Sequence, residues 1–449
     1  MADRIKERIF IKGVLNLQTP CMIGSGNSLN TDNDVLVNGD NKPFIPGTTL
    51  AGVFRSYLAD SVDFNNEDKE LKYLFGSPLN IKDKISTTVS NIYISDANCI
   101  SDFQILVRDG VELNKYKSAV DKSKYDYEVI SPQTKFEFHI EVLLREKFDY
   151  YKDNKLISED IDYGIIKDYL ARLLIALEEE RISIGSKTRR GYGLIKLEDV
   201  KVELIDDSDY KHFVNFTFNN IKPNVNYRDW LRGDLNNSFY ELEVNLELAS
   251  SLIIRKYVDE LDKDDVPDQI MLRIDNNTPV IPGTSWSGCF RHRTIELFKE
   301  LDIDINLVNK IFGYVDEVND DNSTYSKFTF IESCFENYQY RVVRRNKIDR
   351  FSGGAVDKAL FDEEFLEKGN TVLRIRIDNE YENYIGILLI ILDEINNGLL
   401  ALGGETGIGR GLFKVINVKL NNENLTNELK NEYLSRLIVE IKKEGDYAN

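Results

Sequence analysis

The stretch IPGTTLAGVFR at residues 45–55 returns as IPGTSWSGCFR at residues 281–291, and seven of the eleven positions are identical at an offset of 236. The same offset, within one residue, relates Leu-Phe-Gly at 74–76 to a later near-copy, Ile-Phe-Gly. A glycine-rich stretch at 184–193 recurs at 402–411 with an offset of 218. Because the blocks keep their order in both halves, the sequence predicts an internal duplication.

Each half shows the same order of expected elements. An alternating strand opens it, the Pro-Gly turn begins a helix with Thr48 or Thr49 as the expected N-cap, and a long polar insertion follows. A further strand, a second helix and a closing strand complete each half, the last two at Tyr169–Leu177 and Leu194–Leu204, then at Ile385–Ile395 and Leu412–Leu420. This order predicts an α+β fold of two tandem ferredoxin-like (RRM-like) modules, each an antiparallel sheet with helices on one face.

The offsets also suggest domain boundaries. We expect a first module at 1–204, a connector at 205–238, a second module at 239–421 and a C-terminal segment at 422–449. In that last segment apolar residues recur every fourth position, which predicts an amphipathic helix docked on the body or on a neighbour.

Composition excludes several classes of protein. The net charge of −19 argues against nonspecific coating of nucleic acid, and 42% hydrophobic residues are enough for ordinary cores. No apolar run reaches the roughly 18 residues of a membrane span, so a soluble cytoplasmic protein with no membrane partner is expected. The four cysteines lie far apart, and His139, His212 and His292 share no metal-ligand spacing. Catalysis is therefore expected to use carboxylates, lysines, hydroxyls or a bound metal ion.

The glycine-rich stretches are candidate phosphate-binding turns. Glycine lets backbone N–H groups approach a phosphate closely, and nearby cations supply charge. The candidate RNA-binding residues here are Lys187, Arg189, Arg190, Gly191, Gly193, Gly409, Arg410 and Gly411. A tight turn from helix to strand is the alternative interpretation, but two copies with flanking arginines favour phosphate binding.

The repeated helix carries a glycine and an arginine on one face. Gly52 and Gly288 lie inside the expected helices, where glycine costs roughly 1 kcal/mol relative to alanine. Arg55 and Arg291 follow three residues later, on the same face. This combination suits a nucleic-acid backbone that crosses the helix, and close packing of another helix is the alternative.

The insertions combine cations with aromatic residues despite the overall acidity. The second insertion holds Arg344, Arg345 and Arg350 near several tyrosines and a phenylalanine, and the first holds lysines that include Lys115 and Lys117. Stacking rings interleaved with cations are typical of single-stranded nucleic-acid binding. A solvated hairpin face is the alternative.

Together these motifs resemble the RAMP proteins of CRISPR type III effector complexes. The resemblance rests on Gly24 and Gly26 after the first strand, on the Ile-Pro-Gly block, Leu-Phe-Gly and the terminal Gly-x-Gly, and residues 346–355 look like the thumb hairpin of that family. The target-cleaving backbone subunits are the most similar members. Two modules in one chain look like the fused double-backbone subunit of the type III-D branch.

The resemblance implies a function. It implies an antiviral-defence subunit that works with other type III effector subunits and binds guide RNA (CRISPR RNA), with Gly24 and Gly26 among the contacts. It also implies cleavage of complementary single-stranded target RNA at sites set by each module.

The same resemblance implies a catalytic aspartate in a loop shortly before each Ile-Pro-Gly turn. Asp32 and Asp268 both lie fourteen residues before the proline of the motif, and Asp34 and Asp265 are the near alternatives. Such a carboxylate can help to deprotonate a ribose 2′-hydroxyl or hold a divalent ion against phosphate oxygens. We therefore expect a metal-dependent endoribonuclease with Mg²⁺ at Asp32 and Asp268.

Two other functions stay open on the sequence alone. One is a non-catalytic scaffold that grips guide RNA while another subunit cuts. The other is a guide-processing endoribonuclease, which usually depends on a histidine. The three histidines fall outside every repeated block, which argues against the second alternative.

Overall fold

The computed structural model describes residues 4–61, 69–76, 88–111, 121–152, 155–235, 238–256, 267–275, 277–315 and 323–447. The chain divides into two compact units, one formed by most of the chain up to Ser238 and the other by most of the chain from Phe239. Residues 189–191 and the described parts of 109–125 group with the second unit. Each unit has its own hydrophobic core.

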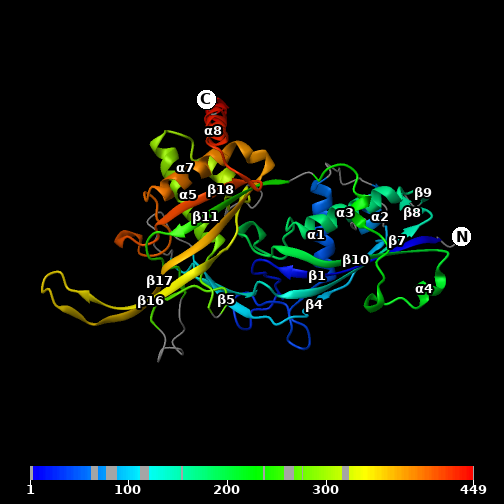
Figure 1. Ribbon diagram of the computed structural model, residues 1–449, viewed down its shortest axis with the longest axis horizontal. Helices are drawn as coiled ribbons and strands as arrows, with labels where there is room; N and C mark the ends of the chain where they lie inside the picture. The colour runs from blue at the N-terminus through cyan, green and yellow to red at the C-terminus, as the bar shows by residue number, and fades with distance from the viewer. Residues whose placement is uncertain are drawn as a thin grey trace. The chain divides into compact units, whose positions relative to one another are not determined.

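The first unit is built on a four-stranded antiparallel sheet with the order β10-β1-β7-β3. Its strands are β1 (Ile5–Leu17), β3 (Ile92–Ile94), β7 (Lys135–Arg145) and β10 (Ile195–Asp206). The long helices α1 (Gly47–Ser61) and α3 (Tyr163–Glu178) cover one face of this sheet (Figure 1). That strand order, with two helices on one face, is the ferredoxin-like arrangement.

Shorter elements complete the first unit and its insertions. They are β2 (Phe44–Ile45), α2 (Lys69–Phe75), β4 (Ala97–Asn98), β5 (Ile105–Gly110), β6 (Tyr125–Ile130), β8 (Phe148–Lys152), β9 (Lys155–Glu159), η1 (Thr188–Arg190), α4 (Tyr210–Val214), η2 (Phe218–Asn220) and η3 (Tyr227–Trp230). The connector groups with the first unit rather than standing apart. Its Phe216 stacks on Phe10 of β1 with ring centroids 3.8 Å apart, so the connector covers part of the sheet face opposite the helices.

The second unit repeats the arrangement, with the order β18-β11-β17-β15. Its main elements are β11 (Phe239–Leu248), α5 (Gly283–Glu300), β15 (Phe328–Phe330), β16 (Ser333–Ile348), β17 (Ala355–Asp378), α7 (Ile385–Asn396) and β18 (Phe413–Leu420). The shorter ones are β12 (Arg255–Lys256), β13 (Ile270–Met271), β14 (Val280–Ile281), α6 (Asn306–Phe312), η6 (Asn379–Tyr384), η7 (Thr406–Ile408) and β19 (Glu423–Asn424). The fold is thus α+β with tandem ferredoxin-like modules.

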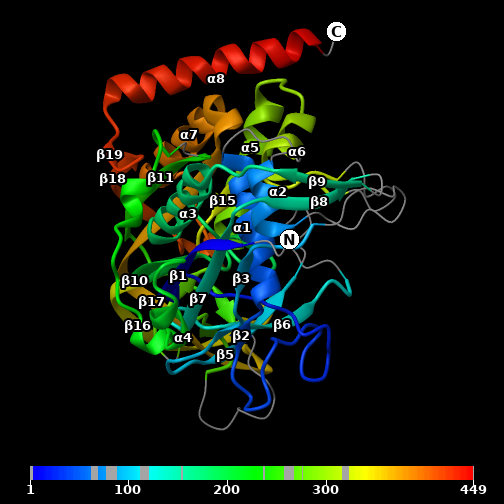
Figure 2. The same cartoon turned by 90° about the vertical axis from the view of Figure 1, so that its right-hand side faces the viewer.

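Two features of the second unit extend beyond the common fold. Strands β16 and β17 continue past the sheet as a projecting hairpin (Figure 1). The C-terminal helix α8 (Asn427–Tyr447) lies along α7 (Figure 2), and it buries Tyr433 and Leu437. Among the described helices, none is both long enough and apolar enough to cross a bilayer.

The glycine of each Pro-Gly turn is required by packing. A Cβ on Gly47 would lie 2.2 Å from the carbonyl oxygen of Ile94, and a Cβ on Gly283 would lie 2.0 Å from that of Phe330. The helices begin at these glycines, one residue before Thr48 and Thr284, so the expected threonine N-cap is wrong. In the first unit the Gly47 N–H instead donates to the Asp96 carboxylate at 2.8 Å.

Candidate functional site

The loop between β1 and β2 is held by one buried aspartate. Asp34 is 7% exposed, and its carboxylate accepts N–H groups from Leu29 at 2.7 Å, Thr31 at 2.9 Å and Asn30 at 3.2 Å, together with the Thr31 hydroxyl at 3.0 Å. These bonds, led by that from Leu29, lower the pKa of Asp34. Position 270, its equivalent in the second half, is isoleucine. Asp34 is therefore a structural residue of the loop.

Asp34→Ala should lower the thermal midpoint of the first unit by about 2–4 °C at neutral pH, because the three N–H groups lose their acceptor. The pKa of Asp34 is depressed in the folded state, so its contribution is fully present above the unfolded value of about 3.9, declines below that value and is lost as pH falls through the lowered folded pKa. Thermal denaturation of both proteins at pH 7 and pH 3.5 measures this. A difference that persisted undiminished at pH 3.5 would contradict it.

Asp32, in contrast, is exposed on the same loop and meets a partner on β6. Its carboxylate Oδ2 accepts the backbone N–H of Asp126 at 3.0 Å, and its own backbone N–H donates to Asp126 Oδ1 at 3.0 Å. No donor among the described residues reaches the other carboxylate oxygen of Asp32, Oδ1. One oxygen of this carboxylate is thus fixed to the protein and the other faces solvent.

Asp268 occupies the equivalent place in the second module. It is exposed, and its Oδ2 accepts the backbone N–H of Asp362 at 2.8 Å. Asp126 and Asp362 are themselves related by the offset of 236, so the same bond joins the same positions in both halves. The alternative residue Asp265 lies outside the described residues.

A second backbone bond repeats in both modules and confirms that the two loops are equivalent. The N–H of Glu128 donates to the Asn33 carbonyl at 3.0 Å, and that of Glu364 donates to the Gln269 carbonyl at 2.8 Å. The strand that braces each loop therefore carries Asp-x-Glu, at residues 126–128 and 362–364. Sequence reasoning missed this pair, although the 236 offset would have revealed it.

The surroundings of the two bracing strands differ in charge. The Asp362 carboxylate forms a two-bond ion pair with Arg344, at 2.7 and 2.8 Å, and this guanidinium lowers the pKa of Asp362. Glu364 accepts two bonds from Arg273, at 2.8 and 2.9 Å. In the first module Glu128 instead accepts the Val35 N–H at 2.9 Å. Arginines therefore offset the acids near Asp268.

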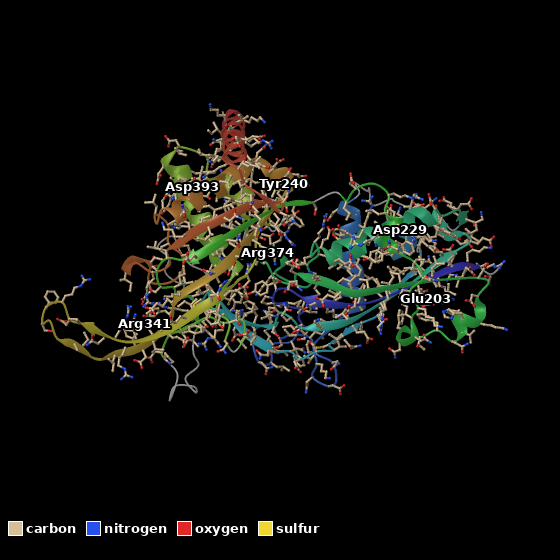
Figure 3. The ribbon with its side chains drawn as sticks, in the orientation of Figure 1. Glu203, Asp229, Tyr240, Arg341, Arg374 and Asp393 are labelled. Carbon is tan, nitrogen blue, oxygen red and sulfur yellow. The ribbon has the colours of Figure 1, made fainter. Side chains whose placement is uncertain are left out.

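The projecting hairpin carries the predicted cations, but most of them are already paired. Arg341, labelled in Figure 3, pairs with Glu367 at 2.7 Å, and Arg345 lies 3.3 Å from both Glu363 and Glu405. Arg344 is also bound to Asp362, so all three of these arginines are paired with carboxylates, and their role in binding single-stranded nucleic acid stays a prediction. Arg350, at the turn, is exposed and has no ion-pair partner among the described residues.

An exposed aromatic ring marks the tip of this hairpin. Phe351 is fully exposed, and the turn beneath it is fixed because the Asp349 carboxylate accepts the N–H groups of Phe351 at 2.8 Å and Ser352 at 2.7 Å. A rigid turn that holds a bare ring in solvent can stack on a nucleic-acid base. The corresponding residues 112–120 of the first insertion, with Lys115 and Lys117, lie outside the described residues.

The last glycine of each glycine-rich stretch serves a tight turn. A Cβ on Gly193 would lie 1.8 Å from the Ile184 carbonyl oxygen, and a Cβ on Gly411 would lie 1.8 Å from that of Leu402. Both have positive φ, 73° and 80°. A tight turn from helix to strand, the alternative to phosphate binding, is therefore sufficient to explain these two glycines. A Cβ on Gly409 would meet nothing described within 4 Å, so packing does not require that glycine.

Arg410 is a buried structural cation. It is 3% exposed, and its Nη2 lies 2.8 Å from Glu363, which is 0% exposed. Its Nε lies 3.5 Å from Glu405, and its guanidinium stacks on Phe365 at 3.9 Å. In this structure Arg410 is therefore not available to a phosphate, in contrast to its predicted role.

The first module fills the same positions with different residues. Tyr127 and Tyr192 correspond to Glu363 and Arg410, and their hydroxyls lie 3.0 Å apart. Lys187 corresponds to Glu405, and its Nζ lies 3.0 Å from the centroid of the Tyr127 ring. A buried contact between the glycine-rich turn and the bracing strand is thus common to both modules.

The other predicted contacts of the first module differ in their surroundings. Arg189 and Arg190 are exposed on η1, but Arg189 pairs with Asp378 at 2.7 Å. Gly191 is buried with a φ of 85°, and a Cβ there would lie 2.3 Å from the Phe330 carbonyl oxygen. A Cβ on Gly24 or Gly26 would meet no described atom within 4 Å. Packing among the described residues therefore leaves space at both loop glycines.

The helix glycines face open space in both modules. A Cβ on Gly52 or Gly288 would meet no described atom within 4 Å outside the helix itself, so the helix-packing alternative is wrong for these residues. Arg55 forms no hydrogen bond or ion pair with any described residue. Arg291 donates to Asn309 at 3.0 Å, and burial lowers the pKa of its guanidinium.

The three histidines have other partners. His139 stacks on Phe218 at 4.2 Å, and burial lowers its pKa. His212 lies 2.5 Å from Glu203, and His292 lies 3.5 Å from Glu296. A histidine-based general acid and base is thus not assembled among the described residues.

The aspartate sites fit a metal ion only if RNA supplies ligands. Within the described ranges, no three His, Cys, Asp or Glu side chains gather in a way that could hold an ion. Asp32 has one free carboxylate oxygen with the Asp126 carboxylate beside it. Mg²⁺ commonly binds through one or two carboxylates together with substrate phosphates and water, so this donor set fits a shared ion.

Known proteins resemble the chain in both halves. The sequence profile of the RAMP superfamily matches residues 14–196 and 245–414, which are well over half of the chain. A curated protein of Methanocaldococcus jannaschii, named "CRISPR system Cms endoribonuclease Csm3", is 24% identical over 218 residues, covering 44% of this chain and 82% of that protein. The matched part of this relative thus has about the length of one module. With two matched regions that coincide with two ferredoxin-like modules, the chain belongs to the RAMP superfamily.

Proposed function

We propose that this chain is a two-module backbone subunit of a type III CRISPR effector complex. In this role it binds guide RNA and cuts complementary single-stranded target RNA once at each module. Membership of the RAMP superfamily and the similarity to a protein named as a CRISPR system endoribonuclease support the complex and the RNA partners. The observation that carries cleavage is the repeated geometry of Asp32 and Asp268.

That geometry suits attack by a ribose 2′-hydroxyl. When a nucleotide of the target leaves the stack, its 2′-hydroxyl can move into line with the adjacent phosphate, and such alignment supplies much of the barrier reduction. The solvent-facing oxygen of Asp32 or Asp268 accepts the hydroxyl proton. The 2′-oxygen then bonds to the phosphorus and breaks the bond from phosphorus to the 5′-oxygen of the next nucleotide, which takes up a proton from water. The products are a 2′,3′-cyclic phosphate and a 5′-hydroxyl end.

A divalent cation, Mg²⁺ by the ligand chemistry of the site, would be held by Asp32 or Asp268 together with phosphate oxygens of the RNA. When bound it would supply positive charge against the developing dianion. Near Asp268, Arg344 supplies further positive charge. It lies on β16 and binds the carboxylate of Asp362, the β17 residue whose N–H contacts Asp268. Phe351 at the hairpin tip would stack on a base and help to hold a nucleotide out of the duplex.

The face of each first helix is the proposed track for the guide backbone. Gly52 and Gly288 leave uncovered backbone beside Arg55 and Arg291, and no described protein atom occupies that space. Protein stability gives no reason for the glycines, since a helix glycine costs about 1 kcal/mol relative to alanine. A bound RNA backbone that occupies this space would explain why both positions are glycine.

Gly52→Ala and Gly288→Ala should therefore change stability and RNA binding in opposite directions. Each should raise the unfolding free energy by roughly 0.5–1 kcal/mol, because the new methyl group clashes with nothing. Each should weaken guide RNA binding several-fold, and the corresponding leucine variants should weaken it further. Thermal denaturation and filter binding measure the two effects. Unchanged guide affinity in the leucine variants would contradict the proposed track.

The size pattern of a cleaved target RNA tests the function as a whole. The assembled complex, loaded with a guide and given an end-labelled complementary RNA, should yield two cuts for each copy of this chain. A scaffold without activity predicts no dependence of either cut on Asp32 or Asp268. End analysis that found 5′-phosphates would contradict attack by the 2′-hydroxyl.

A further inference from the structure

Each candidate catalytic aspartate is held by a bracing strand, but the two strands hold it differently. In the first module the contact is reciprocal, because Asp126 donates its N–H to Asp32 and its carboxylate accepts the N–H of Asp32. In the second module only the backbone N–H of Asp362 reaches Asp268. The Asp362 carboxylate is occupied by Arg344 instead.

We propose that the Asp126 side chain is a positioning residue for Asp32, and that the Asp362 side chain does not have this role for Asp268. The proposal rests on the proposed function, in which Asp32 and Asp268 act on target RNA. It concerns side chains alone, since the backbone donors at 126 and 362 are common to both modules.

The exposure of the loop makes such a brace necessary. Asp32 and Asn33 are exposed between the buried Thr31 and Asp34, so packing restrains the loop on either side but does not set the direction of the Asp32 side chain. Two hydrogen bonds to a strand fix both the backbone and the side-chain direction of Asp32, which leaves one oxygen facing solvent. A reacting group that is displaced by about 1 Å loses a large part of its rate.

The second module has a different source of rigidity. Asp268 follows Pro267, whose ring restricts its own φ and the residue before it. Gln269 donates its N–H to the Asp362 carbonyl at 3.2 Å, in addition to accepting the Glu364 N–H at 2.8 Å, a bond whose counterpart in the first module joins Glu128 to Asn33. In this module the backbone therefore holds the loop, and the Asp362 carboxylate is free to bind Arg344.

The test uses the assembled complex and measures the single-turnover rate of each cut separately. Asp126→Ala should slow the first-module cut about tenfold and leave the second cut at its wild-type rate, which serves as an internal standard. Asp126→Asn should restore the first cut to within about twofold, because the amide oxygen accepts the same N–H without a charge. Target affinity and the thermal midpoint should stay unchanged. Asp160→Ala removes an exposed aspartate of the same module, paired with Lys147, and is the matched control.

Asp362→Ala completes the comparison. It keeps the backbone donor to Asp268, so it should slow the second cut less than Asp126→Ala slows the first. The proposal is overturned if Asp126→Ala leaves the first cut unchanged, if Asp126→Asn is as slow as the alanine variant, or if Asp362→Ala has the larger effect. Asp32→Ala separates a failure of the positioning role of Asp126 from a failure of the proposed cleavage function. If it stops the first cut while Asp126→Ala has no effect, only the positioning role falls, and if it has no effect either, the proposed function falls as well.

Discussion

Asp32→Ala is expected to remove one of two cuts in a complementary target RNA, and Asp268→Ala is expected to remove the other, each slowing its cut by at least about 100-fold. Each carboxylate is exposed on its loop, with one oxygen fixed by a strand N–H at 3.0 or 2.8 Å. Because the sites lie in separate units, each single variant should leave the other cut at its wild-type rate.

The measurement is the length of the fragments from end-labelled target, with guide RNA content and complex assembly recorded for every variant. Asp40→Ala removes another exposed aspartate of the same loop region and should cut like the wild type. The double variant should bind target and cut at neither position. Two undiminished cuts in the double variant would leave the scaffold role as the function of this chain.

Arg410→Ala should destabilise the second unit by about 3 kcal/mol, because it leaves the fully buried Glu363 without its 2.8 Å partner. The sequence had placed Arg410 on a phosphate, which would predict a loss of RNA affinity with little loss of stability. Chemical denaturation and guide binding of the same preparation separate these outcomes. A stable variant with weakened RNA binding would restore the phosphate role.

The pH dependence of this loss has a definite sign. Burial raises the pKa of Glu363, and Arg410 acts in the opposite direction, so removing the arginine raises that pKa further. An acid with a raised folded pKa binds protons more readily when folded, and the stability of the variant therefore falls as pH rises above the ordinary value of about 4.3. The damage should be smallest near pH 4 and largest at neutral pH.

The first module supplies the matched rescue. Replacing both partners, Glu363→Tyr with Arg410→Tyr, reproduces the Tyr127–Tyr192 pair of the equivalent positions. Removing both charges avoids a buried carboxylate that is left with Arg345 alone, at 3.3 Å, so the double variant should be more stable than Arg410→Ala. A double variant less stable than the single one would show that the surroundings accept only the ion pair.

The fold could be predicted from the sequence because the repeated blocks and the periodicity of apolar residues are both visible in short stretches of the chain. The helix expected at Ile385–Ile395 is observed as Ile385–Asn396. The helix expected at Tyr169–Leu177 begins earlier, at Tyr163, because Asp162 caps it by accepting the N–H groups of Gly164 and Ile165. The repeat offset of 236 also identified Asp32 and Asp268 as equivalent positions, and the backbone hydrogen bonds that recur in both modules support this equivalence.

The ion-pair partners of the charged side chains could not be predicted from the sequence in the same way. Sequence shows that Arg344, Arg345 and Arg410 are cations, but not that acids on β17 lie opposite them. Register across a hairpin decides this, and Arg344 faces Asp362 only because β16 and β17 pair at those residues. For the same reason Asp126 and Asp362, far from the loops along the chain, were not recognised as neighbours of the candidate acids.

The unequal bracing strands have an evolutionary consequence. When a subunit assembles as identical copies, every copy carries the same site residues, because one substitution in the gene changes all copies at once. Two sites encoded in tandem escape that constraint, and each can change while its neighbour stays as it was. Tyr127 and Tyr192 in one half, and Glu363 and Arg410 in the other, show that such divergence has reached the interior, so the two proposed cuts of one polypeptide could acquire separate rates and separate ionic requirements.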